Sequence, residues 1–320
     1  MTINNRIAVV IPCYKVKRHV LKVIQSIGPE VEKIYTVDDC CPEQSGTFIQ
    51  SNNTDSRVCV LFNETNKGVG GATKRGYEQA LRDGMEIVIK VDGDGQMDPA
   101  LIPMFAKPII DGRADYTKGN RFFSYDHVSR MPKIRLFGNA VLTFFTKASS
   151  GYWNIYDPNN GYTAIHCRAL SMLTPDKIHN RYFFESDMLF RLNSIRAVVM
   201  DIPMVAVYEG EESSLRIKDI AMLFLTGHIK NFSKRIIYNY FLRDFTIASL
   251  ELIVGVVFLL FGFIYGGINW TQSIIMHNAA PGGVVMLAGL TVIVGIQMLL
   301  SVFNYDVQNV PRIPLSSFDQ

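Results

Sequence analysis

Two long apolar stretches near the C-terminus limit what this chain can fold into. They run from Phe245 to Ile268 and from Gly283 to Phe303, and Glu251 is the single acidic residue in either of them. A bilayer core is crossed by about 20 apolar residues in a helix, so each stretch is long enough. We therefore expect a two-helix transmembrane hairpin over residues 245–303 and a cytoplasmic tail over residues 304–320. A buried helical hairpin in a soluble domain is the alternative.

Basic residues around the two stretches predict their orientation. The connection between them, residues 269–282, contains neither Lys nor Arg. Lys and Arg residues instead precede the first stretch and follow the second: Lys230, Lys234, Arg235, Arg243 and Arg312. Because basic residues concentrate on the cytoplasmic side of a membrane, both termini and the N-terminal domain are predicted to be cytoplasmic.

Two polar residues inside the apolar stretches need a partner. Glu251 and Gln297 are predicted to lie at the same depth on antiparallel helices. An acid exposed to lipid is costly, so we expect Glu251 to face Gln297 or a neighbouring subunit. Extension of Glu251 toward the headgroups is the alternative.

The segment before the first apolar stretch is basic and amphipathic. Residues 215–244 contain six Lys or Arg and two Asp, interleaved with large apolar residues. This pattern is typical of helices in the headgroup region of an anionic membrane, and basic helices packed on a soluble domain are the alternative. The formal net charge of +3 is too small to indicate nucleic-acid binding.

Residues 1–214 alternate between apolar runs and helical patterns. The expected strands are residues 6–12, 33–37, 57–61 and 85–91, and the expected helices are residues 16–27 and 72–82. This order predicts an α/β domain with a mostly parallel, Rossmann-like sheet that binds ligands at the carboxyl ends of its strands.

The end of the fourth expected strand carries paired acids. Asp92-Gly93-Asp94-Gly95-Gln96 follows the apolar run directly. Two close carboxylates are hard oxygen ligands of the kind that Mg²⁺ and Mn²⁺ bind, and the side chain of Gln96 is a further oxygen donor. We therefore predict a divalent cation at Asp92, Asp94 and Gln96 that bridges a substrate diphosphate. A solvated acidic turn is the alternative.

With these residues in view, the chain resembles the family 2 glycosyltransferases of the GT-A fold, in particular the branch that uses polyprenyl phosphate and includes dolichyl-phosphate mannose synthases. The resemblance rests on five segments: Val9-Val10-Ile11-Pro12-Cys13-Tyr14, Val37-Asp38-Asp39, Asn66-Lys67-Gly68-Val69-Gly70-Gly71-Ala72, Val91-Asp92-Gly93-Asp94-Gly95-Gln96, and Asp157-Pro158-Asn159-Asn160-Gly161-Tyr162. It implies that the nucleotide-sugar site is formed by Pro12, Tyr14, Asp39, Lys67 and Asp92.

Two departures from the family pattern affect the nucleoside pocket. The family usually has Tyr-Asn-Glu after its first strand, whereas Lys15-Val16 follow Tyr14 here. It usually has Asp-Asp-Gly-Ser after its second strand, whereas Asp38-Asp39 run into Cys40-Cys41-Pro42 here. The choice between UDP and GDP therefore stays open.

A cluster of cations follows the acidic segment: Lys118, Arg121, Arg130, Lys133 and Arg135. Guanidinium groups bind phosphate in a bidentate manner, so the cluster favours an anionic acceptor. The resemblance points to Arg121 and Arg135 as the residues nearest a lipid phosphate, and we add Lys118 to them. An ordinary solvated face is the alternative.

Three further acids are candidates for a role in catalysis beside Asp94. Glu185 and Asp187 stand where family members with sugar acceptors keep a catalytic base, and Asp157 is an equal candidate for positioning the donor sugar. A hydroxyl acceptor needs a base, whereas a phosphate monoester already carries negative charge near pH 7. Glu185 or Asp187 is thus expected to position substrate rather than abstract a proton.

These features predict an inverting, metal-dependent transfer of a sugar from a UDP- or GDP-sugar to undecaprenyl or dolichyl phosphate; inversion is implied by the resemblance alone. Transfer to a glycolipid or saccharide hydroxyl is the alternative function, and a non-catalytic membrane subunit is a third. We further expect a homo-oligomer, such as a tetramer.

Overall fold

The computed structural model describes residues 6–123, 133–205 and 217–319. They form two compact units, of which the first comprises residues 1–233 with 311–320 and the second comprises residues 234–310.

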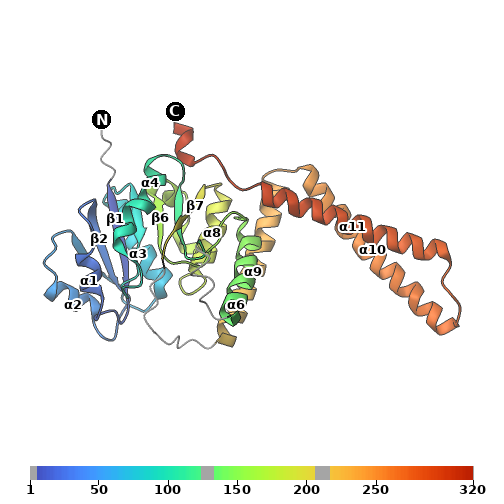
Figure 1. The fold of residues 1–320 in the computed structure, drawn as a ribbon, viewed down its shortest axis with the longest axis horizontal. Helices are drawn as coiled ribbons and strands as arrows, with labels where there is room; N and C mark the ends of the chain where they lie inside the picture. The colour runs from blue at the N-terminus through green and yellow to red at the C-terminus, as the bar shows by residue number, and fades with distance from the viewer. Residues whose placement is uncertain (1–5, 124–132, 206–216, 320) are drawn as a thin grey trace. The chain divides into compact units, whose positions relative to one another are not determined.

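The first unit is built on one seven-stranded sheet with the order β3-β2-β1-β4-β6-β5-β7 (Figure 1). Its strands are β1 (Ile7–Cys13), β2 (Val31–Asp38), β3 (Val58–Phe62), β4 (Ile87–Lys90), β5 (Tyr116–Asn120), β6 (Thr163–His166) and β7 (Val199–Pro203). The first four strands are parallel, β6 is antiparallel to both β4 and β5, and β7 is parallel to β5. The predicted mostly parallel sheet is thereby confirmed.

The helices of this unit cover the sheet and extend from it. They are α1 (Val20–Gln25), α2 (Ser45–Asn52), α3 (Gly68–Arg82), α4 (Ile102–Ile110), α6 (Lys133–Ser150), α7 (Cys167–Ser171), α8 (Phe184–Ser194) and α9 (Ile217–Ile237), the last of which continues into the second unit. The central strands are buried on both faces, as their continuous apolar runs indicate.

The helix bounds differ from expectation at two places near the parallel strand ends. The first helix begins at Val20 rather than at residue 16, and residues 17–19 form a turn before it, in which the N–H of His19 donates to the carbonyl of Val16 at 3.0 Å. The second begins at Gly68, where a turn was expected, because the carboxylate of Asp39 accepts the backbone N–H groups of Lys67 and Gly68. An acceptor at this position stabilises the start of a helix despite its glycines.

The C-terminal residues return to the first unit. Leu315 is buried, its backbone N–H donates to Oδ1 of Asp115 at 2.9 Å, and its carbonyl accepts from Arg168 at 3.1 Å. The other carboxylate oxygen of Asp115 accepts from the N–H of Val198 at 2.7 Å. Asp115 thus joins the C-terminal segment to the edge of the sheet, a contact that the sequence analysis did not foresee.

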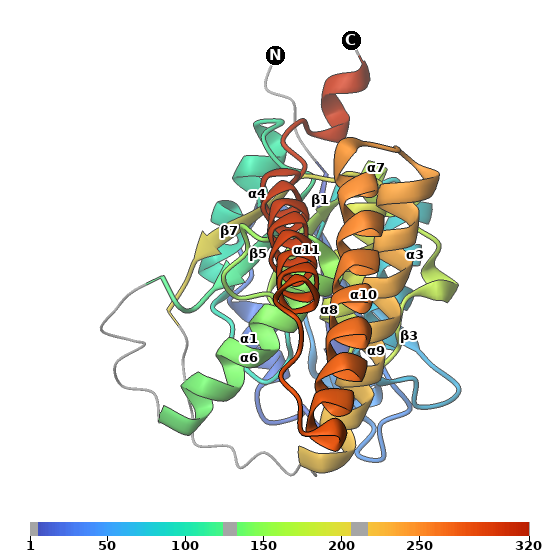
Figure 2. The same ribbon diagram turned by 90° about the vertical axis from the view of Figure 1, so that its right-hand side faces the viewer.

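The second unit contains two antiparallel helices, α10 (Ile247–Met276) and α11 (Gly282–Gln308), shown in Figure 2. Both are longer than the expected stretches, and both are long and apolar enough to cross a membrane. They pack closely where Gly255 meets Gly295, since a Cβ on Gly295 would come within 3.0 Å of the carbonyl oxygen of Gly255. Close approach of this kind at small residues is typical of membrane helix pairs.

The polar partner of Glu251 differs from the one expected. Its Oε2 accepts a hydrogen bond from the hydroxyl of Ser301 at 2.8 Å. Gln297 is exposed on the surface of α11 instead. Ser301 is four residues after Gln297, one helical turn closer to the start of α10, and a hydroxyl there gave no signal in the sequence.

An ion pair in the second unit joins the end of α9 to the C-terminal end of α11. Arg235 binds both carboxylate oxygens of Asp306, at 2.5 and 2.9 Å, and the hydroxyl of Tyr240 donates to the same carboxylate at 2.9 Å. The segment Tyr238–Leu242 between them is π-helical. In place of several interfacial helices over residues 215–244, the described part contains α9 alone, followed by this turn.

We expect Asp115→Ala to destabilise the first unit. The substitution leaves the buried N–H groups of Leu315 and Val198 without their acceptor, at a cost of about 2 to 4 kcal/mol. The melting temperature of the purified protein should fall by roughly 5 to 15 °C.

Asp111→Ala is the matched control. Among the residues that the structure describes, Asp111 pairs with Lys107 and Arg113, whose side chains are 69% and 55% exposed. Surface pairs contribute little, so its melting temperature should stay close to that of the wild type. Equal melting temperatures for both variants would contradict the role given to Asp115.

Candidate functional site

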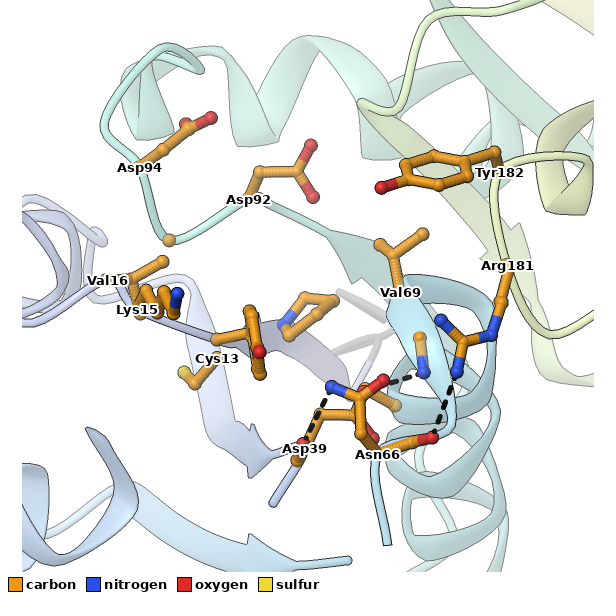
Figure 3. Close-up of a pocket in the computed structure, with 15 residues that line it drawn as sticks. Cys13, Lys15, Val16, Asp39, Asn66, Val69, Asp92, Asp94, Arg181 and Tyr182 are labelled. Carbon is orange, nitrogen blue, oxygen red and sulfur yellow. Dashed lines mark hydrogen bonds between the residues drawn. The ribbon is translucent and has the colours of Figure 1, made fainter. Parts of the chain in front are cut away.

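A cavity of about 610 Å³ opens at the carboxyl ends of β1, β2 and β4. Figure 3 shows its lining, in which Asp92 and Asp94 lie across the cavity from Asn66 and Arg181. The lining residues are Pro12, Cys13, Tyr14, Lys15, Val16, Asp39, Asn66, Gly68, Val69, Ala72, Asp92, Gly93, Asp94, Arg181 and Tyr182. A volume of this size suits a small-molecule substrate.

Asp92 and Asp94 lie just beyond the end of β4 and line the cavity, so the structure brings the two predicted metal ligands together. Oδ1 of Asp94 accepts the backbone N–H of Gln96 at 3.0 Å. Gln96 is not among the lining residues, and its described contribution is this N–H group. The carboxylates fit a divalent cation, while Gln96 shapes the turn that carries Asp94.

Asp92 has a charged partner that the sequence analysis missed. The ammonium of Lys90 lies 2.6 Å from Oδ1 of Asp92, and it also donates to the carbonyl of Gly161 at 3.1 Å. The side chain of Lys90 is 1% exposed, whereas that of Asp92 is 30% exposed. Residues two apart on a strand point to the same face, and this spacing was the one available signal.

A second buried lysine lies level with Lys90 in the sheet. Lys90 and Lys118 both pair with Thr163, from the two strands that flank β6. The ammonium of Lys118 donates to the carbonyl of Asn160, and burial lowers the pKa of Lys118 to about 8. Lys118 is fully buried, a position that does not favour the predicted contact with a lipid phosphate.

Glu185 lies in the first turn of α8, near both lysines. Its Oε1 is 3.9 Å from the ammonium of Lys90, and its charge raises the pKa of Lys118. Burial raises the pKa of Glu185, and the two lysines lower it in part. Although burial opposes it, the carboxylates of Asp92 and Glu185 raise the pKa of Lys90 above its usual value. The pattern is that of a buried, mutually neutralised set of charges.

Asp39 forms one wall of the cavity and fixes the start of α3. Its carboxylate accepts from the N–H of Lys67 at 2.9 Å, the N–H of Gly68 at 2.7 Å and the side chain of Asn63 at 2.9 Å. Asp39 and the predicted residues Pro12 and Tyr14 all line the cavity. Lys67 is not among the lining residues, and its backbone N–H group donates to the carboxylate of Asp39.

Two cations at the cavity were not predicted as site residues. Lys15 follows Tyr14 on the loop after β1, and Arg181 comes from the loop before α8. A guanidinium nitrogen of Arg181 lies 3.4 Å from the carbonyl oxygen of Asn66 (Figure 3). No sequence pattern pointed to Arg181, because 115 residues separate it from Asn66.

Arg121 is bound to Asp157. Its Nε and Nη2 contact the two carboxylate oxygens at 2.7 and 3.0 Å, and its backbone N–H donates to the same carboxylate at 3.2 Å. The Arg121 side chain is 28% exposed and that of Asp157 is 2% exposed. The structure thus brings these two predicted residues together as an ion pair. Arg130 and the side chains of Lys133 and Arg135 lie outside the described residues.

Asp187 is buried in α8 and joins three segments. Its carboxylate accepts from the N–H of His179 at 2.8 Å, from Nε of Arg191 at 3.1 Å and from the side-chain amide of Asn231 at 3.0 Å. It is not among the lining residues of the cavity. These contacts indicate a structural role, with both oxygens used inside the protein.

Exposed apolar side chains gather on two helices of the first unit. The buried His228 of α9 contacts Ser149 of α6 at 2.8 Å, and burial lowers the pKa of His228 to about 4. On the same two helices, each of the following side chains is at least 40% exposed: Phe137, Val141, Phe144 and Phe145 on α6, and Met222, Leu225, Ile229 and Phe232 on α9. We call these eight residues the apolar face of α6 and α9.

The composition of the site limits how it can bind a metal. Among the described residues, no group of three or more His, Cys, Asp and Glu side chains has the arrangement of a metal site. Mg²⁺ is often bound through one or two carboxylates together with substrate phosphates and water. Asp92 and Asp94 meet that requirement only if a ligand in the cavity completes the coordination.

Known proteins resemble this chain in sequence. It is 27% identical over 216 residues to the UDP-N-acetylglucosamine--dolichyl-phosphate N-acetylglucosaminyltransferase of Methanococcus voltae, covering 63% of this chain and 86% of the relative. It is 26% identical over 176 residues to the undecaprenyl-phosphate mannosyltransferase of Micrococcus luteus, covering 54% of this chain and 71% of the relative.

A likeness of fold is also found among solved structures. The structure of glucosyl-3-phosphoglycerate synthase from Mycobacterium tuberculosis in complex with uridine diphosphate superposes with a TM-score of 0.54 at 16% identity, covering 72% of this chain and 80% of that one. This likeness confirms the expected GT-A fold.

The sequence profile described as glycosyl transferase family 2 matches residues 8–173, about half of the chain and nearly all of the cavity lining. The strand ends, the paired acids and the relatives agree with this match. The chain therefore belongs to glycosyl transferase family 2, and it is a glycosyltransferase.

Proposed function

We propose that this protein transfers a sugar from a nucleotide-sugar to polyprenyl phosphate, such as undecaprenyl or dolichyl phosphate, with inversion at the anomeric carbon. The observation that carries the proposal is the cavity itself, where Asp92 and Asp94 stand opposite Arg181. A cation-binding pair of acids and a guanidinium around one space suit a diphosphate between them.

The donor binds in this cavity. Pro12, Tyr14 and Asp39 border the nucleoside, since they line the part of the cavity formed by β1 and β2. Lys15 and Arg181 neutralise the diphosphate, together with a cation held by Asp92 and Asp94. When bound, Mg²⁺ or Mn²⁺ supplies positive charge where the leaving diphosphate gains negative charge.

The proposed acceptor is the lipid phosphate named for both curated relatives above. The apolar face of α6 and α9 supports a lipid-facing surface on the first unit, because exposed apolar side chains in such number are unusual on a soluble surface. Arg121 keeps Asp157 neutralised, and Arg135 is proposed to bind the lipid phosphate. Lys118 then supports the neighbouring loop from within.

The membrane placement follows from the second unit. The helices α10 and α11 are proposed to span the bilayer, with both chain ends and the catalytic unit in the cytoplasm. The basic residues that flank these helices support this orientation. The product would be a lipid-linked sugar made at the cytoplasmic leaflet.

A phosphate acceptor also agrees with the contacts of the two acids in α8. Glu185 is held near two lysines, and Asp187 accepts three hydrogen bonds. Neither arrangement suits a base that must take a proton from a sugar hydroxyl. The acceptor oxygen of a phosphate monoester needs no such base.

Asp94→Asn should abolish sugar transfer, because the substitution removes a charged cation ligand at the open end of β4. Excess EDTA should have the same effect on the wild type, and added Mg²⁺ or Mn²⁺ should restore activity. Both are measured as transfer of labelled sugar into lipid extract.

Asp98→Asn is the control for that substitution. Asp98 is exposed and its carboxylate caps the turn after the acidic segment, so the variant should keep most of its activity. Full activity of Asp94→Asn, or of the wild type in excess EDTA, would contradict a metal-dependent mechanism.

The double variant Phe137→Ser/Phe144→Ser should weaken use of the lipid acceptor. The two side chains are 71% and 52% exposed, and insertion of such side chains into lipid is worth about 1.5 kcal/mol or more each. The KM for polyprenyl phosphate should rise by about tenfold or more, while the KM for the nucleotide-sugar stays unchanged.

Met172→Ser serves as its control, since Met172 is 52% exposed but lies at the end of α7. Its kinetic constants should match the wild type. If the double variant alters both KM values equally, the apolar face of α6 and α9 does not serve the acceptor.

Asp187→Asn should lower stability but keep transfer to polyprenyl phosphate. An amide in place of the carboxylate weakens the contacts with His179, Arg191 and Asn231, at a cost of about 1 to 3 kcal/mol. Thermal unfolding and kcat should be measured on the same sample. A normal melting temperature combined with a loss of 10²- to 10⁴-fold in kcat, roughly the worth of a general base, would favour a hydroxyl acceptor.

A further inference from the structure

The environment of Lys90 is unusual for a residue beside a cation site. Lysine is rarely fully buried unless it is paired, and Lys90 is 1% exposed in the central strand β4. Its ammonium contacts Oδ1 of Asp92 at 2.6 Å, the carbonyl of Gly161 at 3.1 Å and Oε1 of Glu185 at 3.9 Å. The first two contacts are hydrogen bonds, and the third is an ion pair at longer range.

The contact with Lys90 leaves one oxygen of the Asp92 carboxylate for a cation. Oδ1 accepts from Lys90, so Oδ2 would be the oxygen that Asp92 offers to a cation in the cavity. A Cβ on residue 161 would lie 2.8 Å from the ammonium of Lys90 and 3.0 Å from Oδ2 of Asp92, so Gly161 leaves room for this arrangement. Because residue 161 has no side chain, its backbone can lie directly against the pair.

The same contact places a positive charge next to the cation site. An ammonium repels a divalent cation that binds the same carboxylate, and the repulsion is weakly screened because Lys90 is buried. The acids that remain for the cation are few, since the described residues contain no larger group of metal ligands. The protein alone should therefore bind the cation weakly.

We propose that Lys90 is a positioning residue that orients Asp92 for one-oxygen coordination and keeps the cation affinity of the empty enzyme low, so that the cation is held firmly only together with a diphosphate. The inference rests on the metal site proposed above. It concerns a residue outside the acidic segment, and it predicts a change in cation binding that a purely structural lysine would not produce.

The test measures Mn²⁺ binding to the full-length protein in detergent without nucleotide. Electron paramagnetic resonance of Mn²⁺ is the readout. A neighbouring charge of opposite sign shifts proton binding to a carboxylate by about 1 to 3 pKa units, and a divalent cation meets the same repulsion. We expect Lys90→Met to lower the Kd for Mn²⁺ by about tenfold or more.

Lys118→Met is the matched control. It removes a second buried lysine, level with Lys90 in the sheet and close to the same Glu185, but one that donates to Asn160 rather than to Asp92. Its effect on the Kd for Mn²⁺ should be clearly smaller. Equal effects of the two substitutions would show that total charge matters and not the contact with Asp92, which overturns the proposal.

A second variant guards against a failure to fold. Lys90→Met/Glu185→Gln removes one charge of each sign, so no new net charge is buried, and it should also bind Mn²⁺ more tightly than the wild type does. An unchanged or higher Kd in both Lys90 variants overturns the proposal. If Asp94→Asn binds Mn²⁺ with the same Kd as the wild type, the proposed metal site itself is wrong.

The wild type supplies a test that needs no substitution. In a structure determined with Mn²⁺ and a nucleoside diphosphate, Mn²⁺ should contact Oδ2 of Asp92 while the ammonium of Lys90 remains on Oδ1. Coordination of Mn²⁺ by both oxygens of Asp92, with Lys90 displaced, would contradict the inference.

Discussion

A positive charge buried in the centre of the sheet determines much of the site. Lys90 sits in β4 between β1 and β6, where an unpaired ammonium would be very costly. Asp92 and Glu185 supply the neutralising charges from the strand end and from the start of α8. The acidic segment and α8 are therefore tied to each other through this one group.

The same requirement explains the arrangement of the neighbouring loops. Gly161 has to leave space for Lys90, and its carbonyl accepts from the ammonium, so the loop between Asp157 and β6 is fixed to Lys90. On the other side of the cavity, Asp39 holds the start of α3 with a carboxylate that is also buried. Two buried charges thus fix the walls, and the exposed groups between them are left for substrate.

The sequence predicted the parts of the fold whose signal is local. The strands β1, β2, β3 and β4 are apolar runs followed by polar clusters, and their ends were located to within about two residues. Strand β5 contains Lys118, Gly119 and Asn120, which do not read as a buried strand, so it was missed. The helix α6 was also missed: the predicted cation cluster ended in its first turn, and no element was predicted for the rest of the helix.

The candidate site divides in the same way. Asp92 and Asp94 were found because they are close together in the sequence, and Asp39 was found through the resemblance to the family. Arg181 and the pairing of Arg121 with Asp157 depend on contacts between distant segments, which no local pattern contains. Burial changed the interpretation of Lys118 and Asp187, since a charged residue in a sequence does not reveal whether its charge is already used inside the protein.

The most direct test of the account is the identity of the product. Purified enzyme should be incubated with Mn²⁺, polyprenyl phosphate in detergent and a panel of UDP- and GDP-sugars, and the lipid fraction analysed by mass spectrometry and by NMR of the anomeric centre. We expect one lipid-linked monosaccharide whose anomeric configuration is opposite to that of the donor. Sugar found only on a hydroxyl acceptor, or retention of the donor configuration, would contradict it.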